Sequence, residues 1–222
     1  GILVYTYGGA PYEDRGNVVR YNVSENDAVR LRQYGAIYVG NDGKGMSGVE
    51  IYQNTFITDQ PAHGLVNVHG KGVGVAFLNN LLVTKGAPLV NIDQDSGKIV
   101  FQGNLYWVVG GTFRTAGKAK SGSLDGGRKL GKELLGGNPV GLFADPRLDL
   151  EVPRGTAGDL NTTSGRGQAP PLSRFLPPAG SPAVDAGLDL KAIFKIEAGG
   201  RDVQGRKAPA GGAADVGACE RE

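Results

Sequence analysis

The sequence predicts an all-β solenoid, in which the chain coils around an axis and adds one rung of parallel strands with each turn. Four short apolar segments superimpose on an asparagine, namely VVRYNVS, IYQNTFI, FLNNLLV and FQGNLYW around Asn22, Asn54, Asn80 and Asn104. Short strands at residues 37–39, 66–68 and 90–92 alternate with them. Strand-bearing repeats of roughly two to three dozen residues are typical of a solenoid. Parallel crossovers are right-handed in nearly all cases, so we expect a right-handed parallel β-helix.

The asparagines recur at one fixed place in each repeat. Three positions before them stand apolar residues: Val19, Ile51, Phe77 and Phe101. Alternation of this kind turns one side of each strand into a core. An amide side chain both donates and accepts, so asparagines on successive rungs can bond to one another. We expect a buried, structural asparagine stack.

The composition limits the classes of function. Glycine contributes 38 of 222 residues, which suits many tight turns between short strands, and apolar residues at 40% support a core. The net charge is +2 and no long basic stripe is present, so nucleic acid is a poor candidate partner. No apolar run is long enough to span a membrane. The single cysteine, Cys219, excludes an intrachain disulfide framework and zinc-finger spacing.

The chain divides into two parts. Residues 1–108 carry the repeats, whereas residues 109–222 are rich in Gly, Lys, Arg and Pro. We expect the second part to be an irregular segment that packs along the coil or caps its end, with Trp107 attaching it to the coil. The chain opens on the strand-like pattern GILVY, so an upstream β-helix portion of the same protein is an expected partner.

Two stretches resemble bacterial right-handed parallel β-helix proteins, the pectate-lyase-like family. The first is VVRYNVSEND, GAIYV and VEIYQNTFI within residues 18–57, and the second is the closing series GLFADPRL, SPAVDAG, GRDVQGR and ADVGACE. Cys219 stands where that family usually has an aromatic residue. The resemblance implies a secreted, periplasmic or cell-surface protein associated with polysaccharides. It implies no active site, because no specific lyase, hydrolase or epimerase motif matches.

The second set of strands carries the strongest polar pattern. Aligning YVGND, NVHGK and NIDQD gives three columns: Tyr38, Asn67 and Asn91; Gly40, His69 and Asp93; Asp42, Lys71 and Asp95. Adjacent rungs lie about 4.8 Å apart, so His69 is expected beside Asp93, and Lys71 between Asp42 and Asp95. A histidine oriented by a carboxylate is a general base, and two carboxylates can perform acid–base work on a sugar. The catalytic candidates are therefore His69, Asp93 and Lys71.

Other residues are candidates for binding. The substrate-binding candidates are Tyr38, Asn67, Asn91, Tyr52 and Arg20, because a tyrosine can stack on a sugar ring. Asp42 and Asp95 are candidate ligands for Ca²⁺, which prefers oxygen. In a lyase acting on an anionic polysaccharide, such a cation or a lysine would neutralise the sugar carboxylate. The competing interpretation is that these residues are solvated turn residues with no such role.

These observations lead to two functional hypotheses. The first is the C-terminal part of an exported polysaccharide lyase or glycoside hydrolase, with the polysaccharide along an outer face of the coil. The alternative is a non-catalytic, glycan-binding or adhesin-like surface module. A groove between the loops at 25–34 and 40–48, with His69 and Asp93 within hydrogen-bonding reach, would favour the enzyme.

Overall fold

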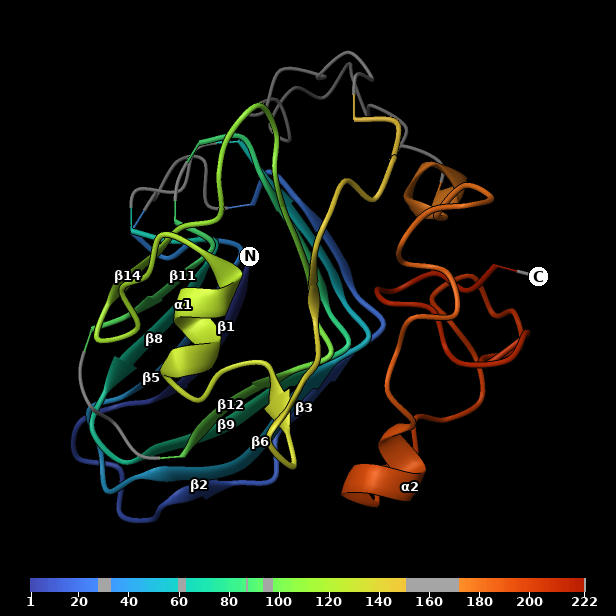
Figure 1. Cartoon of the computed structure of the whole chain (residues 1–222). Helices are drawn as coiled ribbons and strands as arrows, with labels where there is room; N and C mark the ends of the chain where they lie inside the picture. The colour runs from blue at the N-terminus through green and yellow to red at the C-terminus, as the bar shows by residue number, and fades with distance from the viewer. Residues whose placement is uncertain (28–32, 60–62, 87, 94–97, 151–171, 222) are drawn as a thin grey trace, which may run out of the picture.

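Three sheets of parallel strands make up most of the computed structural model, which describes residues 1–27, 33–59, 63–86, 88–93, 98–150 and 172–221 (Figure 1). Sheet A contains β1 (Ile2–Thr6), β5 (Ile37–Asn41), β8 (Val66–Gly70), β11 (Val90–Ile92) and β14 (Thr115–Gly117). Sheet B contains β2 (Asp14–Arg15), β3 (Val18–Arg20), β6 (Met46–Tyr52), β9 (Val73–Leu78) and β12 (Ile99–Gln102). Sheet C contains β4 (Val23–Glu25), β7 (Thr55–Thr58), β10 (Leu81–Thr84), β13 (Leu105–Val108) and β17 (Leu142–Phe143).

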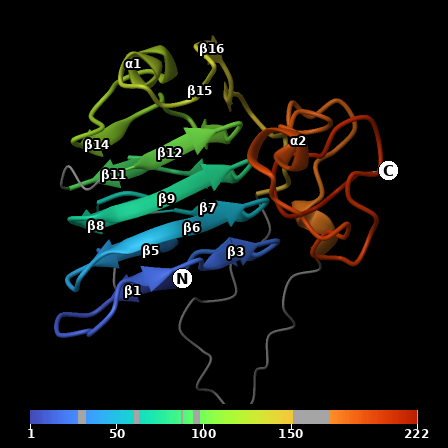
Figure 2. The same cartoon turned by 90° about the horizontal axis from the view of Figure 1, so that it is seen from below.

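The chain visits sheets A, B and C in turn and then begins again one rung further on. Each inner strand therefore pairs in parallel with strands of the turns before and after it, as β5 does with β1 and β8. The predicted all-β class and the stacking of parallel strands are confirmed, and the arrangement is compatible with a parallel β-helix. Figure 2 shows the rungs from the side, with β1 and β3 at one end and the helix α1 at the other.

The asparagine stack is present at the junction between sheets B and C. The side-chain amide of Asn54 donates to Asn80 at 2.9 Å, and that of Asn80 donates to Asn104 at 3.0 Å. Asn22 donates to Asn54 at 3.0 Å and begins the stack. The residue before each asparagine has a positive φ, which turns the chain from one sheet into the next. The prediction of a self-satisfying stack is therefore confirmed.

The inward-facing side chains form one continuous core between the sheets. Its largest members are fully buried, among them Phe56 and Phe77. Phe77 and Phe101 occupy equivalent places on neighbouring rungs of sheet B and stack with their ring centroids 4.6 Å apart. Aromatic residues therefore repeat inside the coil as the asparagines do at its corner.

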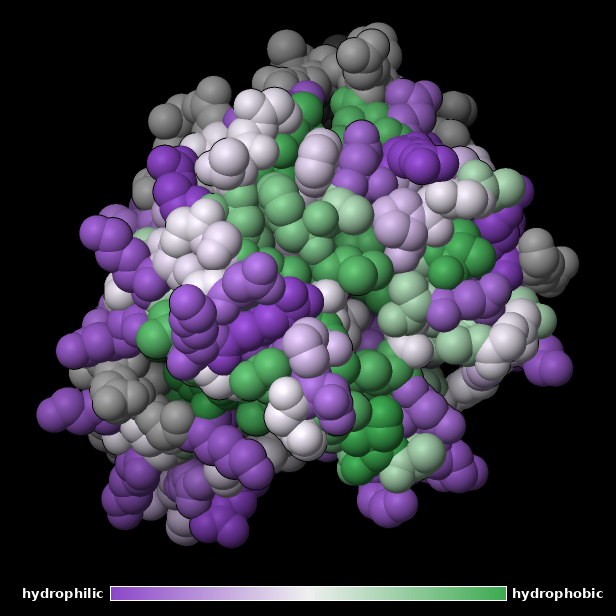
Figure 3. Space-filling model, viewed as in Figure 1, coloured by the Kyte–Doolittle hydropathy of each residue, from purple (hydrophilic) through white to green (hydrophobic). Residues whose placement is uncertain are grey.

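The stacking of strands runs past residue 108. Thr115–Gly117 joins sheet A and Leu142–Phe143 joins sheet C, while α1 (Leu124–Lys129) and the hairpin of β15 (Leu134–Leu135) and β16 (Asn138–Pro139) lie over this end. Apolar side chains gather near the middle of this end and polar ones surround them (Figure 3). Within the described ranges no helix has the length and apolar character needed to cross a membrane.

The C-terminal segment covers the outer faces of sheets C and B. A short 3-10 helix (Leu172–Phe175) and α2 (Leu190–Phe194) belong to it. Phe175, Val216 and Cys219 pack on sheet C, and Leu190 and Ile196 pack on sheet B. Carboxylates of this segment accept hydrogen bonds from backbone amides, as Asp202 does from Gln204, Arg206 and Glu220. The described part of this segment lies on the side away from sheet A (Figure 1).

Candidate functional site

Two of the three polar columns predicted for the outer face of sheet A are in register. Tyr38 lies opposite Asn67, and Asn67 lies opposite Asn91. Asn67 is only 2% exposed, donates to the Gly64 carbonyl at 2.9 Å and accepts from Asn91 at 3.2 Å. These amides hold neighbouring rungs together, so Asn67 offers no free group to a substrate.

His69 and Asp93 are brought together. Gly40 and His69 are paired in register, and the Asp93 amide donates to the Val68 carbonyl, which places Asp93 one rung further along the same column. His69 Nδ1 is hydrogen-bonded to Asp93 Oδ2, and each side chain keeps about a third of its surface exposed. The other carboxylate oxygen of Asp93 faces the Gly70 amide at 3.3 Å. With the proton on Nδ1, the lone pair of Nε2 is available to accept a proton.

Asp42 extends this arrangement on the other side of the imidazole. Its Oδ1 lies 3.8 Å from His69 Nε2, too far for a hydrogen bond, and its Oδ2 accepts from the Tyr5 hydroxyl. Asp42 directly follows β5, whose last residue, Asn41, donates to the Lys71 carbonyl at 2.6 Å. Asp93, His69, Asp42 and Tyr5 thus form a chain of polar groups across the outer face. Burial and the hydrogen bond to Asp42 raise the pKa of Tyr5 well above its usual value.

Three tyrosines of the site were missed by the sequence analysis. Tyr5 and Tyr7 come from β1 and the turn after it, Tyr34 precedes β5, and all join Tyr38. The ring centroids lie 4.9 Å apart for Tyr5 and Tyr7, 5.9 Å for Tyr5 and Tyr38, and 5.2 Å for Tyr34 and Tyr38. Tyr38 in turn lies 6.0 Å from the His69 ring. Burial, followed by Asp93 and Asp42, raises the pKa of Tyr38 to about 12, so the Tyr38 hydroxyl remains a protonated donor.

Gly40 creates the space in which Tyr5 lies. A Cβ atom at Gly40 would stand 2.6 Å from Cε2 of Tyr5 and 2.9 Å from Cε1 of Tyr38. A contact this short is not tolerated, so any side chain here would displace both rings. Tyr5, Gly40 and His69 therefore occupy the same column on three successive rungs, with the glycine in the middle.

Two candidates for sugar binding, Arg20 and Tyr52, lie elsewhere, on sheet B. Arg20, Tyr52, Leu78 and Gln102 do share a column on sheet B. The C-terminal segment covers this column, so Tyr52 is only 2% exposed and packs in the cluster that contains Leu190 and Ile196. Arg20 donates to the Ala198 carbonyl at 2.7 Å. Both residues therefore attach the C-terminal segment to the coil.

The remaining candidates are Lys71 and the pair proposed for Ca²⁺. Lys71 is exposed in the turn after β8, and within the described residues it forms no ion pair with Asp42. Asp95 lies outside the described residues, as does part of the loop at 25–34. Among the residues that are described, no group of three His, Cys, Asp or Glu side chains could hold a metal ion.

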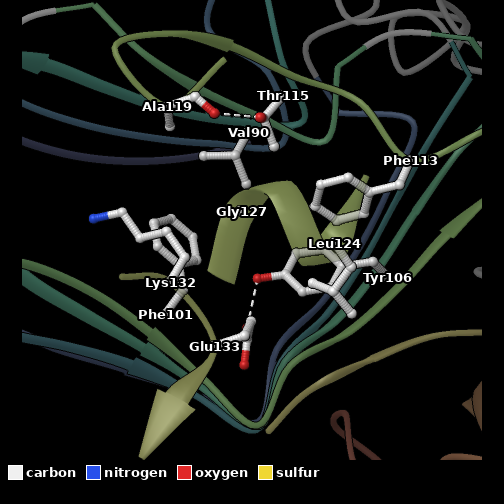
Figure 4. A pocket seen from close by; sticks show the side chains of 10 residues that line it. All are labelled: Val90, Phe101, Tyr106, Phe113, Thr115, Ala119, Leu124, Gly127, Lys132 and Glu133. Carbon is white, nitrogen blue, oxygen red and sulfur yellow. Dashed lines mark hydrogen bonds between the residues drawn. The ribbon is translucent and has the colours of Figure 1, made fainter. Parts of the chain in front are cut away.

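A second polar cluster lies inside the capped end and was not anticipated. The buried carboxylate of Glu133 accepts from the Asn104 amide at 2.7 Å. It also accepts from the Tyr106 hydroxyl at 2.7 Å (Figure 4). Leu142 pairs with Leu105, so Gly141 occupies the place that Asn104 has one rung earlier. A Cβ atom at Gly141 would lie 2.3 Å from Glu133 Oε2. Glu133 therefore supplies the acceptor that a fifth asparagine would have supplied.

The burial of Glu133 predicts a pH-dependent stability. Burial raises its pKa from 4.5 to about 7 against the opposing hydrogen bonds from Tyr106 and Asn104. The folded state then binds a proton more readily than the unfolded state, so the free energy of unfolding rises as the pH falls from about 7 to about 4.5. The contribution is on the order of 3 kcal/mol. Urea unfolding of the wild type is expected to show a higher midpoint at about pH 5 than at about pH 8.

Glu133→Gln is expected to reduce this difference, because the amide carries no charge to bury. Burial also raises the pKa of Glu220 to about 7, with the same sign. The double variant Glu133→Gln/Glu220→Gln should therefore lose more of the pH dependence than either single variant. A Glu133→Gln midpoint that varies with pH as in the wild type would contradict the assignment.

Comparison of the chain with models of protein families, with curated proteins and with solved structures found no match in any of the three. The geometry of the outer face of sheet A is therefore the basis for proposing a function.

Proposed function

We propose that this chain is a right-handed parallel β-helix of the pectate-lyase-like kind and part of an exported carbohydrate-active protein, located in the periplasm, at the cell surface or outside the cell. Three observations support this proposal: the three stacked parallel sheets, the asparagine stack at one corner, and the C-terminal segment packed along two of the outer faces. The third face, that of sheet A, is then the place for a substrate.

The proposed activity is cleavage of a polysaccharide that lies along sheet A, by a lyase or a glycoside hydrolase. The observation that carries it is the His69–Asp93 pair, exposed to solvent and built from two adjacent rungs. Asp93 orients the imidazole and would stabilise the imidazolium that forms when Nε2 takes a proton. In a hydrolase that proton comes from the attacking water, whose oxygen bonds to the sugar carbon, and Asp42, held by Tyr5, is the second carboxyl group, which would give a proton to the departing glycosidic oxygen.

In a lyase the same Nε2 would remove the proton from the carbon next to a sugar carboxylate, and the electron pair left on that carbon would form a double bond as the glycosidic oxygen on the adjacent carbon leaves. Lys71, exposed in the turn that directly follows β8, would neutralise that carboxylate. The two reactions use the same base and differ in whether the substrate carries a negative charge at the cleavage point.

A second candidate function is binding of a glycan without cleavage, as a surface or adhesin-like module. The exposed tyrosine rings favour it, because aromatic faces bind sugars without any acid–base chemistry.

Incubation with a panel of neutral and acidic polysaccharides separates these functions. Absorbance from unsaturated ends would identify a lyase, and new reducing ends without that absorbance would identify a hydrolase. Binding without either product would support the module. The proposal fails if no polysaccharide of either class is bound or cleaved.

A further inference from the structure

We propose that Tyr5, Tyr7, Tyr34 and Tyr38, here called the tyrosine cluster, form a binding subsite for uncharged sugar units beside the His69–Asp93 pair. This inference rests on the proposed function, since it requires a polysaccharide along sheet A. It goes further by naming the class of sugar and the residues that hold it.

The rings of the tyrosine cluster are contiguous and partly open to solvent. They form a line from Tyr7 through Tyr5 to Tyr38, with Tyr34 at its side, and each neighbouring pair of ring centroids is separated by less than the 6.0 Å that joins Tyr38 to His69. Tyr7 is 66% exposed and Tyr34 is 40% exposed. The line crosses the rungs and leads directly to the imidazole, so a chain bound on the rings would continue across His69.

The charge of this subsite favours a neutral sugar. The carboxylate of Asp42 lies within the tyrosine cluster, bonded to the Tyr5 hydroxyl and more than half exposed. The cations that lie over aromatic rings in the described part of the chain, Lys132 and Arg174, face phenylalanines and not these tyrosines. A uronate bound on the rings would place its carboxylate near that of Asp42, whereas the hydroxyl groups of a neutral sugar would donate to it.

The cluster is held in place by a glycine. The Tyr5 ring lies where a side chain at Gly40 would stand, and this position lets its hydroxyl reach Asp42 and its face approach Tyr38. Gly40 has neither a positive φ nor a turn position that would call for glycine, because it lies inside β5. Its lack of a side chain is explained by the ring above it.

Calorimetric titration with defined polysaccharides tests the subsite. The His69→Ala protein is used as the parent, so that turnover does not consume the ligand. The neutral probes are arabinoxylan, mixed-linkage β-glucan and galactomannan, and the anionic probes are polygalacturonate and alginate. Binding of at least one neutral probe is expected, with weaker binding of both anionic probes at physiological salt.

Tyr7→Ala and Tyr34→Ala, added to this parent, are each expected to weaken binding of the neutral probe about tenfold, equivalent to about 1.4 kcal/mol. Gly40→Ala is expected to weaken it as well, because it displaces Tyr5. Tyr12→Ala is the matched control, since Tyr12 is 80% exposed and makes no ring contact with the cluster in the described structure. Its affinity should equal that of the parent.

The outcomes separate this inference from the proposed function. If no probe binds to the parent or to the wild type, the proposed function fails and the subsite with it. If a probe binds but Tyr7→Ala and Tyr34→Ala match the Tyr12→Ala control, the subsite alone is overturned. Preferential binding of polygalacturonate or alginate would also overturn it and leave the polysaccharide function standing.

Discussion

Asn80→Ala is expected to lower the free energy of unfolding by about 3–4 kcal/mol, because it removes the middle of the asparagine stack. The Asn80 amide donates to Asn104 and to the Ile51 carbonyl, and its oxygen accepts from both the backbone and the side chain of Asn54. All of these groups are fully buried. Their partners would lose hydrogen bonds in a place that water does not reach, and each unsatisfied buried group costs about 1–3 kcal/mol.

Asn22→Ala is the matched control for this expectation. Asn22 begins the stack and is exposed, and its side-chain amide donates to Asn54 and to the Arg20 carbonyl. The Asn54 oxygen keeps a second donor in the Asn22 backbone amide. Its loss should cost about 1 kcal/mol or less. Urea unfolding of the two variants measures the difference, and equal losses of stability would show that the stack does not carry the buried hydrogen bonds described here.

Much of the coil could be predicted because its geometry repeats in the sequence. Asn54, Asn80 and Asn104 each follow an apolar strand at the same offset, and the alignment of the second set of strands placed His69 beside Asp93. Contacts between successive rungs depend only on the repeat length, so a period found in the sequence fixes them. The position of Tyr5 in the tyrosine cluster could have been predicted in the same way, because aligning β1 with β5 and β8 puts Tyr5 in the column of Gly40 and His69.

What the repeats could not show is which face becomes covered. Tyr52 and Arg20 occupy an outward column as predicted. A segment from more than a hundred positions later packs against this column, so that Tyr52 is buried and Arg20 is hydrogen-bonded to it. Glu133 could not be found from the repeat either. The fifth rung has Gly141 at the asparagine position, and the acceptor arrives from a different part of the chain.

His69→Ala is expected to lower the rate of polysaccharide cleavage by about 100-fold or more, since a positioned general base contributes on that scale. Asp93→Asn should lower it as well, because an amide facing Nδ1 no longer fixes the tautomer in which Nε2 is free to accept a proton. His63→Ala is the control: His63 is exposed and lies outside sheet A, so this variant should retain about the wild-type rate.

The rate is measured on the polysaccharide that the wild type cleaves best. Both histidine variants should unfold at similar urea concentrations, since neither side chain is buried. Undiminished cleavage by His69→Ala would remove the imidazole from the reaction and leave the outer face of sheet A as a binding surface only.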